Sequence, residues 1–129
     1  MSRSLIDIAA ELGNLDIIKY IIDNKYSTPS IKTLTTAAKY GHIPIVKYLV
    51  DIHIDIHSNN SVVLRQAVKG NYIDVVQYLI SIWANINDIH YKILYKIIGK
   101  KYLNMMQLIF DNTNIKQHIT DPYQHNINK

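Results

Sequence analysis

The sequence contains no cysteine, four glycines, three prolines, one tryptophan and one phenylalanine. Without cysteine the chain cannot form disulfides, use a thiolate nucleophile or bind zinc through thiolates. The glycines are isolated, so there is no glycine-rich phosphate loop, and neither Gly-x-Ser-x-Gly nor His-Glu-x-x-His occurs. These absences argue against several common classes of enzyme.

Long apolar runs are also missing. No segment approaches the roughly 18 apolar residues of a transmembrane helix. Asp7 and Glu11 interrupt the N-terminal segment, which lacks the apolar core of a signal peptide. We therefore expect an intracellular protein, in the cytoplasm or the nucleus, that is not secreted and does not bind membranes.

Size and charge are those of a small folded protein. The 129 residues suit one domain. The net charge of +4 is mild, and most basic residues alternate with acidic ones along the chain. This pattern favours solubility over nucleic-acid binding.

Three segments of the chain are near-copies of one another: Ala9–Ile22, Ala37–Val50 and Ala67–Ile80. Their matching tyrosines Tyr20, Tyr48 and Tyr78 are 28 and 30 residues apart. A period of this length indicates a stacked-repeat protein, in which each unit buries its apolar face against its neighbours. Such an architecture favours a binding surface over a catalytic pocket.

The second copy predicts two short helices joined by a tight turn. The spacing of Leu34, Ala37 and Ala38 places them on one helix face. Gly41 suits the left-handed residue that ends a helix, and Pro44 suits the first turn of the next helix. The apolar stripe of that second helix is Ile45, Val46, Leu49 and Val50.

The pattern Ala-Ala-x-x-Gly-His-Ile-x-Ile-Val-Lys-Tyr-Leu-Val at 37–50 resembles an ankyrin repeat. The longer stretch Ala37–His57 is similar to the short-period ankyrin repeats of giant DNA viruses. The resemblance implies an all-α solenoid of stacked helix-turn-helix units over residues 1–118. We place the repeats at about 4–30, 31–60, 61–88 and 89–118, followed by a polar tail at 119–129.

Several positions depart from the family pattern. The opening Thr-Pro-Leu-His of a typical repeat is replaced by Lys32–Thr35, so the Thr and His hydrogen bonds that join neighbouring repeats should be absent. His53-Ile54 replaces the usual Gly-Ala after the second helix, which requires either a left-handed non-glycine residue or a different turn. Asn71 and Lys101 replace the turn glycine in the third and fourth copies. The fourth copy, Ile89–Lys116, is degraded, and we interpret it as a C-terminal cap with a charged outer face.

The resemblance implies a non-catalytic protein–protein interaction module without a cofactor or metal. For a viral member the partner would be a host-cell protein, and we expect a monomer. In the family, contacts are made by the connector tips and the exposed side of the first helices. The corresponding positions here are Thr28, Pro29, Ile31, Lys39, Tyr40, Ser58, Asn59, Ser61, Lys69, Asp88, Ile89, Tyr91 and Lys100.

Two alternatives remain open. Lys92, Lys96 and Lys100 are spaced by four residues next to Lys101, and such a basic stripe could bind nucleic acid or an acidic partner. We favour the outer face of a cap and regard nucleic acid as the less favoured partner. The other alternative is a decaying family member without a dedicated partner.

The remaining candidates have simpler structural interpretations. His53 and His57 have the four-residue spacing of helical metal ligands, but they fall in a connector, where we expect solvated side chains. His42 occupies the turn position at which ankyrin repeats bond to the backbone of an adjacent turn. The equivalent tyrosines Tyr20, Tyr48 and Tyr78 are expected to pack along the stack and not to form a stacking platform for a ligand. Trp83, at a turn, either anchors a partner or covers a helix end.

Overall fold

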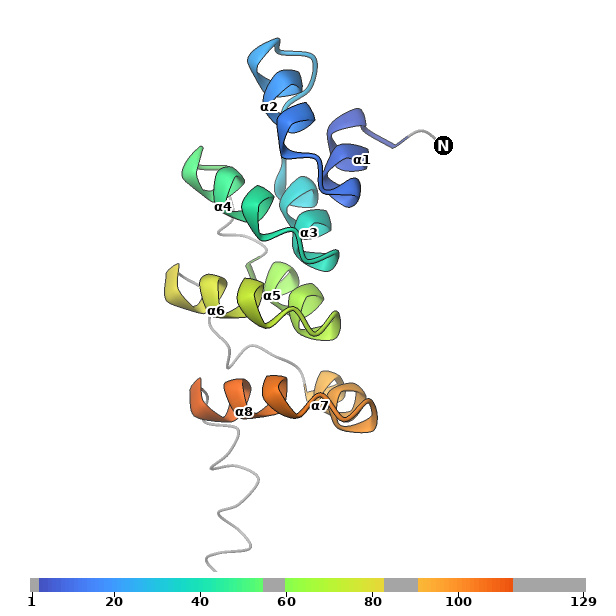
Figure 1. Ribbon diagram of the computed structural model, residues 1–129, viewed down its shortest axis with the longest axis vertical. Coiled ribbons are helices and arrows are strands. Elements are labelled where there is room, and N and C mark those ends of the chain that lie inside the picture. The colour runs from blue at the N-terminus through green and yellow to red at the C-terminus, as the bar shows by residue number, and fades with distance from the viewer. Residues whose placement is uncertain (1–2, 55–59, 83–90, 113–129) are drawn as a thin grey trace, which may run out of the picture.

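The computed structural model describes residues 3–54, 60–82 and 91–112, and within these ranges the protein consists of helices joined by turns (Figure 1). In chain order the helices are α1 (Leu5–Leu12), α2 (Leu15–Asp23), α3 (Ile31–Lys39), α4 (Ile43–Asp51), α5 (Asn60–Lys69), α6 (Ile73–Ile82), α7 (Tyr91–Gly99) and α8 (Leu103–Asn112).

The helices pair within repeats and stack between repeats. Figure 1 shows α1, α3, α5 and α7 in one column and α2, α4, α6 and α8 in a second column beside it. Helix α3 contacts α1 on one side and α5 on the other, and α5 in turn contacts α7. The all-α solenoid predicted from the sequence is therefore confirmed. We refer to the α1, α3, α5 and α7 column as the first-helix layer and to the other column as the second-helix layer.

The core is a continuous strip between the two layers. Within each layer, residues at equivalent positions of the four repeats are buried. In the first-helix layer these residues are Ile6, Leu34, Leu64 and Leu94, and in the second-helix layer they are Ile21, Leu49, Leu79 and Ile109. No described repeat buries its apolar stripe without a neighbour, which is the energetic basis of stacking.

The turn inside each repeat uses a left-handed residue at one fixed position. Gly13 and Gly41 have φ of 77° and 76°, and the equivalent Asn71 and Lys101 have φ of 64° and 61°. The last two copies therefore keep the turn although they lack its glycine, at a cost of roughly 1–2 kcal/mol for each non-glycine residue. The buried Oδ1 atom of Asn71 has no hydrogen-bond partner, which adds to the cost in the third repeat.

The turn after the second helix also contains left-handed residues. Lys25 follows α2 with φ of 58°, and His53 follows α4 with φ of 63°. Of the two alternatives that the sequence left for the missing glycine, the backbone at His53 adopts the left-handed one.

A side-chain bond between the first two repeats is present, although it is not one of the family's Thr and His bonds that the sequence was expected to lack. The hydroxyl of Thr33 on α3 donates to Asp7 Oδ1 on α1 at 2.7 Å, and both side chains are buried. Thr33 Oγ1 also accepts a hydrogen bond from the Ser30 backbone N–H at 3.1 Å. Different residues thus join the first two repeats in the place of the family's Thr and His.

The terminal face of the last described repeat is apolar. Tyr95, Ile98 and Leu103 are 73%, 58% and 75% exposed. A hollow of about 400 Å³ on this face is lined by Ile97, Ile98, Lys101, Tyr102, Leu103 and Met106. Lys92 and Lys96 instead line pockets shared with α5. The interpretation of these lysines as the charged outer face of a cap is therefore wrong.

Candidate interaction surface

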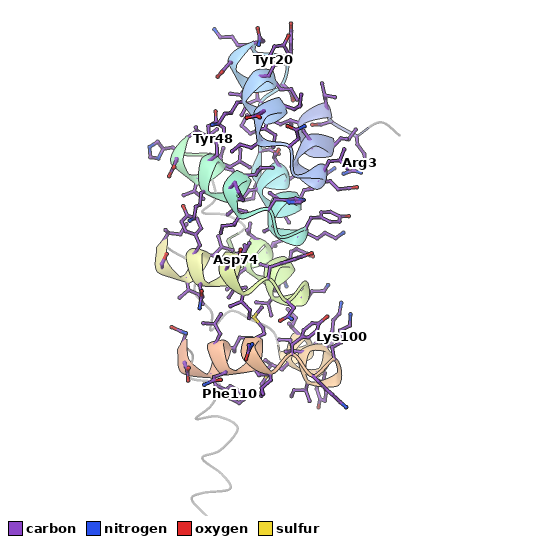
Figure 2. The ribbon with its side chains drawn as sticks, viewed as in Figure 1. Arg3, Tyr20, Tyr48, Asp74, Lys100 and Phe110 are labelled. Carbon is purple, nitrogen blue, oxygen red and sulfur yellow. The ribbon has the colours of Figure 1, made fainter. Side chains whose placement is uncertain are left out.

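The first-helix layer presents most of the contact positions predicted from the sequence that the structure describes. Thr28 lies in the non-helical segment before α3, and Lys39 and Tyr40 lie at the end of α3. Lys69 ends α5, and Lys100 follows α7, where Figure 2 shows it on the first-helix side. These residues are exposed or partly exposed, and Tyr40 is 38% exposed.

The other predicted positions have different outcomes. Pro29 is partly buried, and Ile31, the first residue of α3, is partly buried and packs against the core. Ser58, Asn59, Asp88 and Ile89 lie outside the described residues, as do Trp83, His57 and the 119–129 tail. Ser61 and Tyr91 lie in described helices, but their side chains are outside the description.

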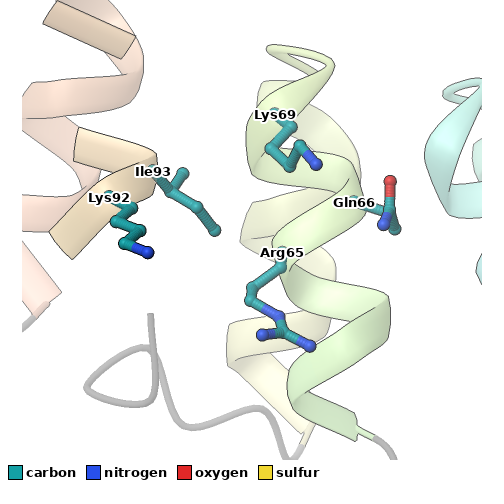
Figure 3. A pocket seen from close by; sticks show the side chains of 5 residues that line it. All are labelled: Arg65, Gln66, Lys69, Lys92 and Ile93. Carbon is teal, nitrogen blue, oxygen red and sulfur yellow. The ribbon is translucent and has the colours of Figure 1, made fainter. Parts of the chain in front are cut away.

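Two adjoining pockets open on the first-helix layer. One, of about 450 Å³, is lined by Arg65, Gln66 and Lys69 of α5 and by Lys92 and Ile93 of α7. Figure 3 shows the side chains of α5 and α7 on either side of this pocket. The other, of about 360 Å³, is lined by Lys39, Gln66, Lys69, Gly70 and Lys96, which come from three successive repeats. We call the cations of both pockets, Lys39, Arg65, Lys69, Lys92 and Lys96, the basic strip.

Acidic residues are unevenly distributed between the two helix layers. Helices α3, α5 and α7 contain no Asp or Glu, whereas the second-helix layer carries Asp16, Asp23, Asp51, Asp74 and Asp111. The separation is partial, because α1 carries Asp7 and Glu11 and the second-helix layer also carries Lys19 and Lys47. The part of the first-helix layer formed by α3, α5 and α7 nevertheless acquires a local positive potential that the net charge of the chain does not reveal.

The tyrosine register belongs to the second-helix layer and is partly covered by lysines. Lys19 Nζ lies 5.3 Å from the ring centroid of Tyr48, and Lys47 Nζ lies 5.5 Å from that of Tyr78. Each lysine therefore contacts the tyrosine of the next repeat, in a cation–π arrangement. Partial burial, together with the carboxylate of Asp51, raises the pKa of the Tyr78 phenol. These contacts support a packing role for Tyr48 and Tyr78, while Tyr20 is exposed (Figure 2).

Each histidine in the described part of the chain either packs within the stack or is exposed to solvent. The His42 Nε2 atom lies 2.8 Å from the carbonyl oxygen of Glu11, and its ring packs against Gly13 of the preceding turn. The predicted turn role of His42 is confirmed. His53 is exposed, and in the described part of the chain no three His, Asp or Glu side chains gather as a metal site would require.

Comparison with known families agrees with this architecture. The family model of ankyrin repeats, three copies in length, matches residues 5–93 and 34–121. The chain belongs to the ankyrin repeat family. A comparison with curated proteins gives no significant match.

Ankyrin repeats are generally protein–protein interaction modules and are typically non-catalytic, and no catalytic family is evident for this chain. Among the described helices, none combines the length and the apolar character needed to cross a membrane.

Proposed function

We propose that this ankyrin repeat protein binds a protein partner through its first-helix layer and the adjoining connector tips. The observation that carries the proposal is the continuity of that layer: α1, α3, α5 and α7 lie side by side and expose Lys39, Tyr40, Lys69 and Lys100. Such a surface is mixed polar and aromatic, as non-obligate interfaces tend to be. A rigid stack also presents these side chains without a large ordering cost on binding.

The likeness of Ala37–His57 to the ankyrin repeats of giant DNA viruses supports a finer inference. The chain is then a viral protein that acts inside the infected cell, as a monomer, on a host protein. The sequence period and the residues of that stretch support this inference.

The proposal predicts that partner capture depends on the first-helix layer. We expect the Thr28→Ala, Tyr40→Ala, Lys100→Ala variant to recover its main partner at least about fivefold less well than the wild type, because interface energy is concentrated in a few side chains. The measurement is a quantitative pull-down from the cells in which the chain is naturally expressed. None of the three side chains is buried or belongs to the basic strip.

A matched control removes three exposed side chains from the second-helix layer, in the variant Gln77→Ala, Gln107→Ala, Asp111→Ala. We expect this variant to retain every partner. Retention of all partners by the first-helix variant, or equal losses in both variants, would contradict the assignment of the contact face.

A further inference from the structure

We propose that the basic strip is a docking groove for an acidic peptide segment of the partner, in an extended conformation and lying across α3, α5 and α7. This inference rests on the proposed function, because it names the chemistry of the segment that the first-helix layer recognises. It goes beyond the general expectation of a protein partner, because it specifies the five cations and the two pockets that would bind the segment.

The placement of the cations is the first argument. Lys39, Lys69 and Lys96 come from three successive repeats, yet they line a single pocket. Lys69 and Gln66 also line the neighbouring pocket, together with Arg65 and Lys92. The pockets therefore form a continuous series of cationic subsites along the stack. Like charges gathered in this way attract anionic groups electrostatically.

The second argument is that the described residues lining these pockets include no acidic side chain. Helices α3, α5 and α7 also carry no Asp or Glu in their sequences. The acids in the described helices of the same repeats, Asp51, Asp74 and Asp111, lie on the second-helix layer instead. The described helix faces that form the groove therefore supply cations, which a segment rich in carboxylates would complement in charge.

The length of the groove fits a short extended peptide. Two helix–helix spacings of about 10 Å separate α3 from α7, so the groove runs over about 20 Å. An extended chain covers that length in about six residues. Carboxylates at alternate positions of such a segment lie on one side of the peptide, where they can face the cations.

The character of the pockets favours a peptide over nucleic acid. None of the described residues that line them is aromatic, whereas single-stranded nucleic-acid sites use aromatic rings as stacking platforms. Ile93 gives one pocket an apolar wall, and Gln66 offers an amide that can bond to a peptide backbone. The acids of the second-helix layer and the net charge of only +4 further disfavour a long polyanion.

The test uses the full chain and a fluorescein-labelled peptide of about eight residues, alternating Glu and Gly, which is long enough to span the groove. Fluorescence anisotropy at low salt should detect binding, and the same peptide with Gln in place of Glu should not bind. The variant Lys39→Gln, Lys69→Gln, Lys96→Gln should raise the Kd about tenfold, because three partly exposed ion pairs are lost.

A matched variant, Lys19→Gln, Lys25→Gln, Lys47→Gln, removes the same charge from exposed lysines on the second-helix side. It should change the Kd by less than about twofold, because these charges are remote and screened. Circular dichroism and thermal melting verify that both variants remain folded. Equal weakening by the two variants would show general charge attraction and would overturn the proposal.

Two further outcomes also overturn it. One is failure of the wild-type chain to bind the Glu peptide at low salt. The other is tighter binding of a single-stranded oligodeoxythymidylate of equal charge, which would assign the basic strip to nucleic acid. If the peptide fails while the pull-down still depends on Thr28, Tyr40 and Lys100, this inference is wrong and the proposed function stands. If the pull-down partner is also independent of those residues, the proposed function fails with it.

Discussion

Replacing Gly41 with alanine is expected to lower the free energy of unfolding by about 3 kcal/mol. Gly41 has φ of 76°, where a Cβ atom is strained. A Cβ atom there would also overlap the ring of Tyr72, the turn residue of the next repeat. The opposite edge of that ring packs against Gly70, so the ring cannot move away from Gly41 without crowding Gly70. Urea denaturation followed by far-ultraviolet circular dichroism measures the change.

The matched control is Gly99→Ala. Gly99 ends α7, and a Cβ atom there meets nothing within 4 Å. Alanine should leave the free energy of unfolding unchanged or raise it by about 0.5 kcal/mol, because glycine is the poorer helix residue. Equal stability of Gly41→Ala and the wild type would contradict the packing of Tyr72 between successive turns.

Replacing Thr33 with valine is expected to destabilise the chain by about 2 kcal/mol. The substitution keeps the volume but removes the hydroxyl that donates to Asp7 Oδ1 and accepts from the Ser30 N–H. The buried Asp7 carboxylate then loses its partner from α3, and a buried polar group without a partner bears its full desolvation cost. The same urea denaturation measures the loss.

Thr36→Val serves as the control, because the Thr36 hydroxyl donates to the Lys32 carbonyl of its own helix and joins no second repeat. We expect this change to stay within about 0.5 kcal/mol. Combining Thr33→Val with Asp7→Ala should cost less than the sum of the two single substitutions, since both remove the same bond. Strict additivity would show that α1 and α3 are not coupled through this pair.

The sequence predicted the fold in considerable detail because the repeat period and the apolar spacing are local signals. The degraded fourth copy still forms the second helix of a repeat, α8 (Leu103–Asn112), although Lys101 replaces the turn glycine before it. The left-handed backbone at Lys101 and Asn71 follows from the register with Gly13 and Gly41 rather than from their own side chains. Stacking requires every turn to have the same shape, so the neighbours impose the conformation that these residues disfavour.

Contacts between repeats were predicted less well. The bond between Thr33 and Asp7 joins residues 26 apart, and alignment to the family pattern suggested only a loss of such bonds. The signal that could have identified it is Asp7 itself, an acid in the first turn of a helix, which was interpreted only as an interruption of an apolar run. Its partner Thr33 lies in the first turn of α3, at a position where the family pattern has no hydroxyl.

The basic strip was also not predicted from the sequence. The spacing of Lys92, Lys96 and Lys100 was visible in the sequence, but these residues were considered as one isolated helix face. Lys39, Arg65 and Lys69 join Lys92 and Lys96 only when α3, α5 and α7 are stacked. The absence of acids from all three helices was available as a sequence signal, and it becomes informative once those helices are known to share a layer.

Distance measurement between the ends of the first-helix layer tests the stack most directly. The chain has no cysteine, so spin labels at Leu12→Cys and Lys100→Cys report a single pair. These exposed residues occupy equivalent positions three repeats apart, and three helix spacings predict a narrow distribution of backbone separations centred at about 30 Å. A broad distribution, or a centre below about 20 Å, would contradict a continuous layer of stacked first helices.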